Sequence, residues 1–158
     1  MLSQKAATVV AFDEALARLA NDMAETMYSV EAIGIAAPQV GRLVRVVVVD
    51  VGYVTIKAHR LRVFVNPVIL AKEGATSSDE GCLSLPGVSA EVPRAARVRV
   101  RAQNLQGEPF EVEAEGLYAI CLQHELDHLI GKLYADNLSR LKRKLLLTEY
   151  TSQYSARR

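Results

Sequence analysis

The first regular pattern of apolar residues lies near the N-terminus. Within residues 12–30 the larger apolar side chains fall at alternating steps of three and four: Phe12, Leu16, Leu19, Met23, Met27 and Val30. This spacing places them on one stripe of an amphipathic helix. A stripe that contains methionine can also line a cofactor, but core packing is its commoner use. We therefore expect this helix to turn the stripe toward the core.

Two segments after this helix predict strands. Residues 43–51, LVRVVVVDV, are dense in β-branched residues, which favour strands. Residues 60–70, RLRVFVNPVIL, predict a further strand that is interrupted at Asn66-Pro67, since the residue before a proline avoids the helical region. The stretches at 32–41 and 73–88 are rich in glycine, proline or polar residues and are expected to be loops, the second ending in an extended segment.

A hairpin and two helices are predicted in the second half. RVRVRAQ at 97–103 alternates strictly, as a strand with one basic solvent face does, and FEVEAEG at 110–116 is its return strand across a turn. From about Gly116 the period becomes helical, and Gly131 suits the end of that helix. Ser139 suits the N-cap of a final helix.

The order of these elements predicts an α+β fold. A helix, several strands and two further helices favour antiparallel sheets packed around the helix that begins at Gly116, with a helix at the C-terminal end. At 158 residues the chain suits one domain, 1–158, with 139–158 as a C-terminal helix or tail. No repeat or linker divides it.

Composition excludes several classes of protein. Half of the residues are apolar and the net charge is +1, so there is no charge excess of the kind that DNA-binding proteins carry. No apolar run is long enough to span a membrane. The start of the chain has no secretory pattern, and Cys82 and Cys121 are the only cysteines. We therefore expect a cytoplasmic protein with free thiols.

The predicted helix from Gly116 contains the metalloenzyme pattern HExxH, as His124, Glu125 and His128. Residues four apart share a helix face, so both imidazoles can reach one ion while the adjacent carboxylate meets a bound water. The alternative is a solvated polar face. Apolar neighbours oppose that alternative, and two of the three histidines of the chain lie in this pattern. The third, His59, is expected to be a surface residue.

A third ligand must come from elsewhere, because no histidine follows His128. Glu149 is one candidate, and the cysteines are the others. The ion should lie near the level of residue 126, ~7–8 Å along the axis from Cys121 at ~1.5 Å per residue, whereas a cysteine Cα lies about 5 Å from its metal. Cys82, next to Gly81 on a predicted loop, can approach from outside the helix and is favoured.

Three segments then resemble one family. GIAAPQ at 34–39, EGCLSLP at 80–86 and QHELDHLIGKLY at 123–134 are closely similar, in order and spacing, to the three signature motifs of the peptide deformylases. The likeness continues through NP at 66–67 and VPRA at 92–95. It implies a peptide deformylase-like fold and removal of the formyl group from N-formylmethionyl nascent peptides, with release of formate.

The resemblance also implies roles for particular residues. Cys82, His124 and His128 match the ligands of one divalent metal, Fe(2+) natively, with Zn(2+), Ni(2+) or Co(2+) as replacements. Glu125 matches the catalytic glutamate, and Gln39 with the backbone N–H of Leu83 matches the groups that stabilise the oxyanion. The remaining matches are a substrate pocket (Ile33, Gly34, Leu117, Ile120 and Cys121) and groups that support the metal ligands (Glu80, Arg94 and Asp127). For Leu117 and Ile120 plain core packing is an equal alternative.

The chain departs from the family pattern at Ala32, where a glycine is usual, and it lacks the usual proline-containing opening before the first helix. A positive φ at Ala32 would strain the alanine, whereas a negative φ would only crowd the substrate entrance. Two alternatives to a deformylase are a small zinc peptidase and a catalytically quiet metal-binding paralogue. We expect a monomer. The family analogy further suggests that the basic segment RLKRK at 140–144 docks on the ribosome, although a solvated face is the commoner use of such a segment.

Overall fold

The structure, a computed structural model, describes residues 2–82 and 84–156. Its helices and strands follow one another along the chain in this order: α1 (Glu14–Ser29), β1 (Gly34–Ala36), the 3-10 helix η1 (Ala37–Val40), β2 (Val46–Val49), α2 (Gly52–Ile56), β3 (Arg62–Glu73), β4 (Thr76–Cys82), β5 (Leu85–Arg94), β6 (Arg97–Gln103), β7 (Pro109–Glu115), α3 (Gly116–Leu129), the 3-10 helix η2 (Tyr134–Asn137) and α4 (Arg140–Ala156). The α+β class predicted from the sequence is confirmed.

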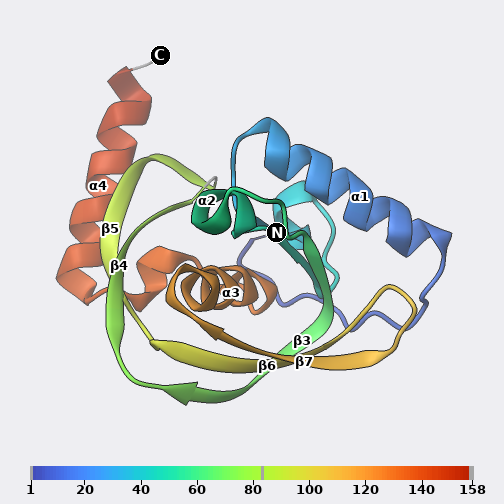
Figure 1. Cartoon of the computed structure of the whole chain (residues 1–158). Coiled ribbons are helices and arrows are strands. Elements are labelled where there is room, and N and C mark those ends of the chain that lie inside the picture. The colour runs from blue at the N-terminus through green and yellow to red at the C-terminus, as the bar shows by residue number, and fades with distance from the viewer. Residues whose placement is uncertain (1, 83, 157–158) are drawn as a thin grey trace.

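Two antiparallel sheets surround α3. Five strands form one sheet in the order β1-β2-β3-β6-β7, and β4 pairs with β5 in a separate hairpin. In Figure 1 α3 is seen nearly end-on at the centre, above β6 and β7, with the hairpin and α4 on one side and α1 on the other. The predicted helix with the HExxH pattern is therefore the central helix of the fold.

Strand β2 explains the unbroken run of valines in the sequence. Val47 and Val49 belong to the apolar cluster under α3, whereas Val46 and Val48 belong to the cluster under α1. Side chains alternate between the two faces of a strand, so a strand covered on both faces needs apolar residues at every position. This strand joins the two layers of the core.

The hairpin of β6 and β7 confirms the prediction from strict alternation. Val98, Val100 and Ala102 are buried against α3, while the arginines between them are exposed. The two strands pair in register from Arg97 opposite Glu115 to Gln103 opposite Pro109. Basic side chains of β6 therefore face acidic ones of β7 across the solvent-exposed surface.

Both α1 and α4 begin at side-chain caps, and the stripe predicted for α1 packs into the core except at Val30, which is 48% exposed. Asp13 caps α1 through the backbone N–H of Leu16 (3.1 Å), and Met23 and Met27 are fully buried on the predicted stripe. Ser139 accepts the backbone N–H of Lys142 (3.3 Å) at the start of α4. Side-chain caps of this kind satisfy N–H groups that have no partner within the first turn.

Two expectations for the connecting segments are wrong. Residues 32–41 are not a loop but contain β1 and η1, and residues 73–88 contain strand β4 before the expected extended end, which is the start of β5. Residues 52–56, for which the sequence predicts no element, form α2. In β4 only Glu80 is buried, so its sequence shows no apolar alternation. The interruption at Asn66-Pro67 is a register shift inside one strand, β3, rather than its end.

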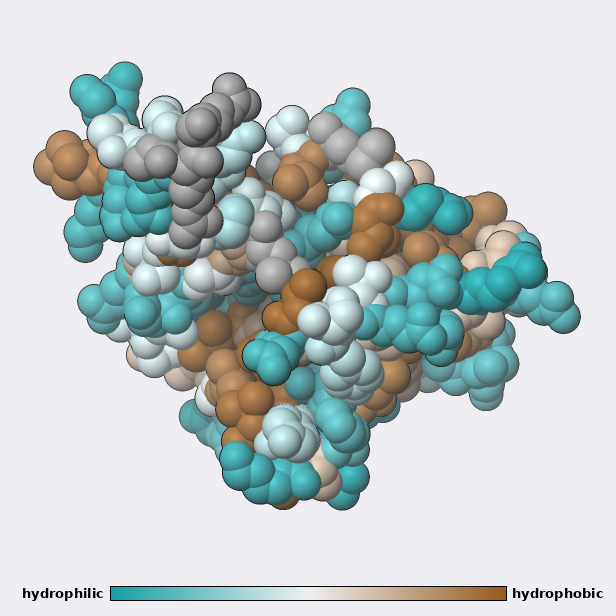
Figure 2. Space-filling view, turned by 90° about the horizontal axis from the view of Figure 1, so that it is seen from above, coloured by the Kyte–Doolittle hydropathy of each residue, from teal (hydrophilic) through white to brown (hydrophobic). Residues whose placement is uncertain are grey.

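A third apolar cluster holds α4 against the hairpin. Leu146 of α4 packs with Val88 and Val92 of β5 and with Tyr134 of η2. Seen from above (Figure 2), the surface is hollowed beside the α4 side of the molecule, and hydrophobic residues line part of the hollow. Within the described ranges, none of the helices has the length and apolarity needed to cross a lipid bilayer.

Candidate metal centre and substrate pocket

Helix α3 places the residues of the HExxH pattern inside the protein. His124, Glu125 and His128 are between 1% and 9% exposed, because α3 packs against the five-stranded sheet and side chains of the hairpin contact both histidines. The two imidazole rings meet edge to face, with centroids 5.3 Å apart. A solvated polar face is thereby excluded for this segment.

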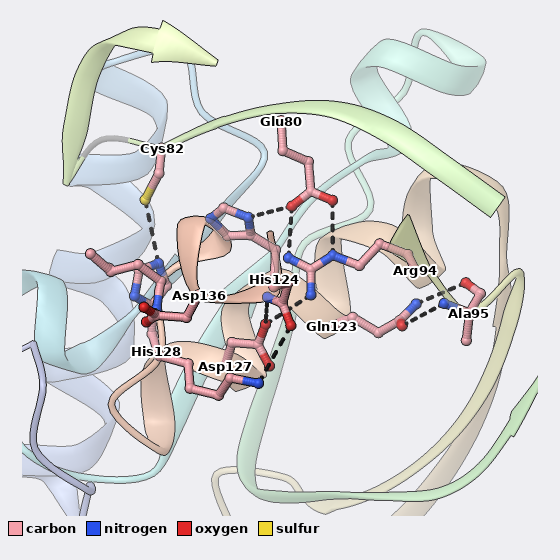
Figure 3. Close-up of polar contacts among 12 residues, drawn as sticks. Glu80, Cys82, Arg94, Ala95, Gln123, His124, Asp127, His128 and Asp136 are labelled. Carbon is pink, nitrogen blue, oxygen red and sulfur yellow. Dashed lines mark hydrogen bonds and ion pairs between the residues drawn. The ribbon is translucent and has the colours of Figure 1, made fainter. Parts of the chain in front are cut away.

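Cys82 reaches the two histidines from the end of β4. Its Sγ lies 3.4 Å from Nε2 of His128, and the ligand atoms of Cys82, His124 and His128 all lie within 4.8 Å of one another (Figure 3). In the described ranges of the chain these three residues form the one such group. A thiolate and two imidazoles at this spacing are a donor set that fits a tetrahedral divalent metal with one open position.

The two other candidates for the third ligand lie elsewhere. Sγ of Cys121 is buried against the backbone oxygen of Ile33 (3.7 Å), and Cys121 is not in the group of ligand atoms. Glu149 is exposed on α4. The geometric argument from reach, which favours Cys82 over Cys121, agrees with this arrangement.

The charges at the site favour a thiolate. Burial alone would raise the pKa of Cys82, but its interactions with His124 and His128 outweigh burial and lower that pKa to about 5. Burial likewise would lower the pKa of His124, but Cys82 and Glu80 raise it to about 10. A sulfur that loses its proton this readily is available in its ligating form.

Glu80 connects His124 to a buried ion-pair network. Its Oε1 accepts from Nδ1 of His124 (2.8 Å) and from Nη2 of Arg94 (2.7 Å), while its Oε2 accepts from Nε of Arg94 (2.8 Å). Arg94 also donates to Asp127 (2.8 Å), which accepts a further bond from Asn137 (3.0 Å). Figure 3 shows this chain of contacts running from the hairpin to α3. Such partners fix the tautomer and orientation of a ligating imidazole.

Gln39 presents its amide nitrogen to the metal centre. The backbone N–H of Ala36 donates to Oε1 of Gln39 (2.9 Å), which leaves Nε2 directed at Sγ of Cys82 (3.7 Å) and Oγ of Ser84 (3.4 Å). The amide orientation follows because a backbone N–H needs an acceptor. Leu83, the other predicted oxyanion group, lies outside the described residues.

Glu125 is buried with a free oxygen. Its Oε2 has no hydrogen-bond partner among the described residues, and burial raises the pKa of the carboxyl group. Gly34 explains how β1 can approach it: a Cβ on Gly34 would lie 3.0 Å from Oε1 of Glu125 and 2.7 Å from Sγ of Cys121. A larger residue at position 34 would therefore require the side chains of Cys121 and Glu125, or the backbone of β1, to shift.

A cavity of about 390 Å³ opens onto the metal centre. Every residue predicted for the substrate pocket lines it, together with groups of the metal centre: Ile33, Gly34, Leu117, Ile120, Cys121, Gln39, Glu80, Cys82, His124 and Glu125. Leu117 and Ile120 are half-buried rather than part of the closed core. The structure thus brings the predicted pocket and the predicted ligands together.

Ala32 lies at the mouth of this cavity without backbone strain. Among the described residues other than glycine, a positive φ occurs at Glu31, Lys57 and Asn66, so Ala32 is not in the left-handed region. Its backbone N–H donates to the carbonyl of Met27 (3.0 Å) in the last turn of α1, and this bond fixes the connection between α1 and β1. Of the two consequences considered for the missing glycine, backbone strain is therefore excluded.

Three residues close to the centre have no predicted role. Ser84 donates its backbone N–H to Sγ of Cys82 (3.4 Å), Asn137 holds Asp127, and the ring of Tyr134 stacks on His124. Tyr134 ends the third motif of the sequence, so its position was a usable signal. Asn137 lies in none of the sequence motifs, and only the fold brings its side chain to Asp127.

Comparisons with known proteins show the family of this chain. The profile of the polypeptide deformylase family matches residues 1–144. A peptide deformylase of Alkalilimnicola ehrlichii is 52% identical over 143 residues, which cover 90% of this chain and 79% of that protein. One of Tolumonas auensis is 53% identical over 129 residues, covering 82% and 75%.

Solved structures give the same result for the fold. A peptide deformylase from Legionella pneumophila matches with a TM-score of 0.89 at 43% identity, covering 99% of this chain and 92% of that one. One from Synechococcus elongatus, in complex with actinonin, matches with a TM-score of 0.87 at 39% identity, covering 94% and 81%. This chain belongs to the polypeptide deformylase family.

Proposed function

We propose that this chain removes the N-formyl group from the N-terminal formylmethionine of nascent polypeptides and releases formate. The observation that carries the proposal is the meeting of Cys82, His124 and His128 at one end of a cavity that also holds the unpaired carboxylate oxygen of Glu125. Membership of the family supports the same activity and does not favour a zinc peptidase or a catalytically quiet paralogue.

The metal is proposed to be held by Cys82, His124 and His128. When bound, a divalent ion supplies Lewis acidity to a water and to the formyl carbonyl. We propose Fe(2+) as the native ion and Zn(2+), Ni(2+) or Co(2+) as replacements. The anionic sulfur supports this choice, since it donates charge and makes activity depend on which metal is present. Metal analysis of protein purified without oxygen tests the assignment, and a native complement without iron would contradict it.

Glu125 is proposed to carry the proton. Its carboxylate takes a proton from the attacking water, whose oxygen bonds to the formyl carbon. The same group returns that proton to the amine nitrogen as the carbon–nitrogen bond breaks, which gives formate and a free N-terminal methionine. Burial of Glu125 raises its pKa toward the range in which a carboxyl group can both accept and donate.

Gln39 is proposed to stabilise the oxyanion that forms in between. The backbone N–H of Ala36 holds the amide so that Nε2 points at Sγ of Cys82, and the substrate carbonyl is proposed to lie beside that sulfur. Removing one such donor costs about 3–4 kcal/mol in other enzymes. The backbone N–H of Leu83 is proposed as the second donor. The methionine side chain would then occupy the pocket of Ile33, Gly34, Leu117, Ile120 and Cys121, with the backbone of Gly34 pairing with the peptide.

Formate release from a formyl-Met peptide by the iron-loaded protein tests the reaction. Glu125→Gln should keep the metal and lose release by a factor on the order of 100 or more, because proton transfer typically contributes 10²–10⁴-fold. Glu149→Gln, an exposed glutamate on α4, is the matched control and should retain release. A metal-loaded wild type that releases no formate would exclude the reaction.

We also propose that α4 binds the ribosome. Arg140, Lys142 and Lys144 are exposed on its first turns, and phosphate contacts by such residues weaken with salt. The triple change of these residues to Gln should reduce cosedimentation with ribosomes at low salt. The same change at Arg18, Arg42 and Lys72, which are exposed elsewhere, removes equal charge and should not. Equal binding of both variants would contradict this role.

We further propose that the protein is a monomeric, cytoplasmic enzyme with one domain. All groups proposed for the reaction come from one chain, and the substrate is a chain that is still being synthesised. Size-exclusion chromatography with light scattering should give the mass of one copy, 17.3 kDa. A dimer that persists on dilution would contradict the monomer.

A further inference from the structure

Tyr134 occupies a position between the two parts of the protein that supply the proposed metal ligands. It is the first residue of η2 and is 1% exposed. Its ring stacks on the imidazole of His124, with centroids 6.0 Å apart and planes 20° apart. Its hydroxyl donates to the backbone oxygen of Val88 in β5 (3.2 Å). One side chain therefore contacts α3 and the hairpin at once.

The ring of Tyr134 restricts a freedom that Glu80 leaves open. The bond from Nδ1 of His124 to Glu80 (2.8 Å) fixes one atom of the imidazole, and the plane of the ring can still tilt about that point. A nearly parallel aromatic ring against the imidazole face opposes such tilting. The direction of Nε2, the atom left to bind a metal, therefore depends on both contacts.

The hydroxyl of Tyr134 acts on the other side of the centre. The backbone oxygen of Val88 lies beside Gly81, the residue before Cys82: a Cβ on Gly81 would be 3.5 Å from it. The pairing of β4 with β5 shifts its register between Gly81 and Cys82, so the regular ladder ends just where Cys82 is presented. The bond from Tyr134 holds the hairpin at this point.

We propose that Tyr134 is a positioning residue of the metal centre, whose ring sets the plane of His124 and whose hydroxyl holds the segment that carries Cys82. This inference rests on the proposed metal site and not on the proposed reaction. The hydroxyl and the ring have separate roles, and the hydroxyl can be removed while the ring is kept. Tyr134→Phe removes the bond to Val88 and keeps the ring, whereas Tyr134→Leu removes both.

Cobalt-loaded protein tests the proposal without reference to formate release. The readouts are the rate of cobalt loss to EDTA and the ultraviolet–visible spectrum, in which the near-ultraviolet thiolate-to-cobalt band and the visible d–d bands report the geometry of the sulfur and nitrogen ligands. Changing partners that orient ligands typically costs 10–100-fold in metal affinity. We expect loss about tenfold faster in Tyr134→Phe, with a shifted thiolate band, and about 100-fold faster in Tyr134→Leu, with changed d–d bands.

Tyr150 offers a matched control. It packs against the same apolar cluster as Tyr134, on α4, and stacks on Tyr154 instead of on a ligand. Tyr150→Leu should lower the stability of the protein and leave the cobalt spectrum unchanged. Equal spectra and equal rates of cobalt loss in Tyr134→Leu and Tyr150→Leu would overturn the proposal, because both changes would then act through core packing alone.

The outcomes also separate this proposal from the proposed function. A wild type that binds cobalt with a thiolate band but releases no formate would overturn the reaction and leave the role of Tyr134 to be decided by its variants. A wild type that takes up no cobalt would overturn both. Tyr134→Phe keeps the buried ring, so it guards against a Tyr134→Leu variant that does not fold.

Discussion

Two buried carboxylates, Glu80 and Asp50, are satisfied in different ways. Glu80 faces a guanidinium and an imidazole, those of Arg94 and His124, and Arg94 in turn pairs with Asp127. Asp50 has a fully buried side chain that accepts from two backbone N–H groups, from the hydroxyl of Tyr28 and from Nδ1 of His59, whose side chain is 62% exposed. The first carboxylate belongs to a network of charges, and the second mainly to a network of dipoles.

The two networks serve different parts of the cavity. Glu80 holds a proposed metal ligand, whereas Asp50 holds the end of α1 through Tyr28 (2.6 Å) and, by its own backbone N–H, the carbonyl of Ile33 (2.8 Å). Charges in a buried network constrain one another strongly, because loss of one partner leaves another charge unpaired. Uncharged hydrogen-bond donors lose less when the carboxylate that they contact becomes neutral, because no buried charge is left unpaired. The comparison therefore predicts unequal responses to similar mutations.

The largest expected effect is that of Arg94→Met. Methionine fills much of the space of the side chain but leaves the carboxylates of Glu80 and Asp127 without their buried cation. Breaking such a network by removing one partner typically costs about 3–5 kcal/mol. The free energy of unfolding, measured in urea on the metal-free protein, should fall by that amount.

The control for Arg94 is an arginine without a buried partner. Arg99→Met changes an exposed residue of β6 that lies opposite Glu113, and it should alter the free energy of unfolding by no more than about 0.5 kcal/mol. Similar losses in the two variants would show that Arg94 contributes no more than a surface charge.

Glu80→Gln should weaken metal binding more than it weakens the fold. Its amide oxygen can still accept the two bonds that Oε1 accepts, but its NH₂ group would then face the donor Nε of Arg94, and His124 would lose a charged acceptor. Loss of such an acceptor typically reduces metal affinity 10–100-fold, equivalent to about 1.4–2.7 kcal/mol. Competition with a chelator measures the affinity. An affinity equal to that of wild type would mean that His124 is oriented without Glu80.

Part of this organisation could be predicted from the sequence, because it depends on local periodicity. The helical stripe of α1, the alternation of β6 and the spacing of His124 and His128 each follow from neighbours within a few residues. Cys82 could be favoured as the third ligand because the length of a metal–sulfur bond limits how far Cys121 can reach. These predictions needed no knowledge of tertiary contacts.

The hairpin and the Asp50 network could not be predicted in this way. Strand β4 has a polar sequence because Glu80 is its one fully buried residue, so no apolar alternation marks it. Asp50 meets Tyr28 and His59 across separations of 22 and 9 residues, which only the completed fold brings together. The contact of Tyr134 with His124 is hidden for the same reason. Residues that support the site were therefore harder to find than those proposed to perform the chemistry.

Asp50→Asn should have a smaller effect than Arg94→Met and no effect on metal affinity. The remaining oxygen of Asn can accept the backbone N–H groups of Gly52 and Arg60, while its NH₂ group faces the hydroxyl of Tyr28, which can accept. We expect a loss of about 1–2 kcal/mol in the free energy of unfolding, the cost of weaker hydrogen bonds to a neutral group. A loss of metal in this variant would show that the two networks are coupled.

The smallest effect concerns pH. Burial alone would raise the pKa of Asp50, but hydrogen bonds from Tyr28, Arg60, His59 and Gly52 outweigh it and hold that pKa below its ordinary value. A carboxyl group with a lowered pKa in the folded state binds its proton first in the unfolded state, whose pKa is about 3.9. Its contribution to stability is therefore complete above that value and is lost as the pH falls through the lower, folded pKa.

The difference in unfolding free energy between wild type and Asp50→Asn isolates this contribution, since the charges around Glu80 are common to both proteins. It should stay constant from pH 7 to about pH 5 and narrow at lower pH, as Asp50 takes up its proton. Tyr28 and His59 are the titratable groups that face Asp50, and both remain in the variant, where they face a neutral amide in place of the carboxylate. A difference that grows as the pH falls would mean that the pKa of Asp50 is raised in the folded protein. Asp50 would then be a buried acid kept neutral, and the contrast with Glu80 would be one of protonation rather than of partners.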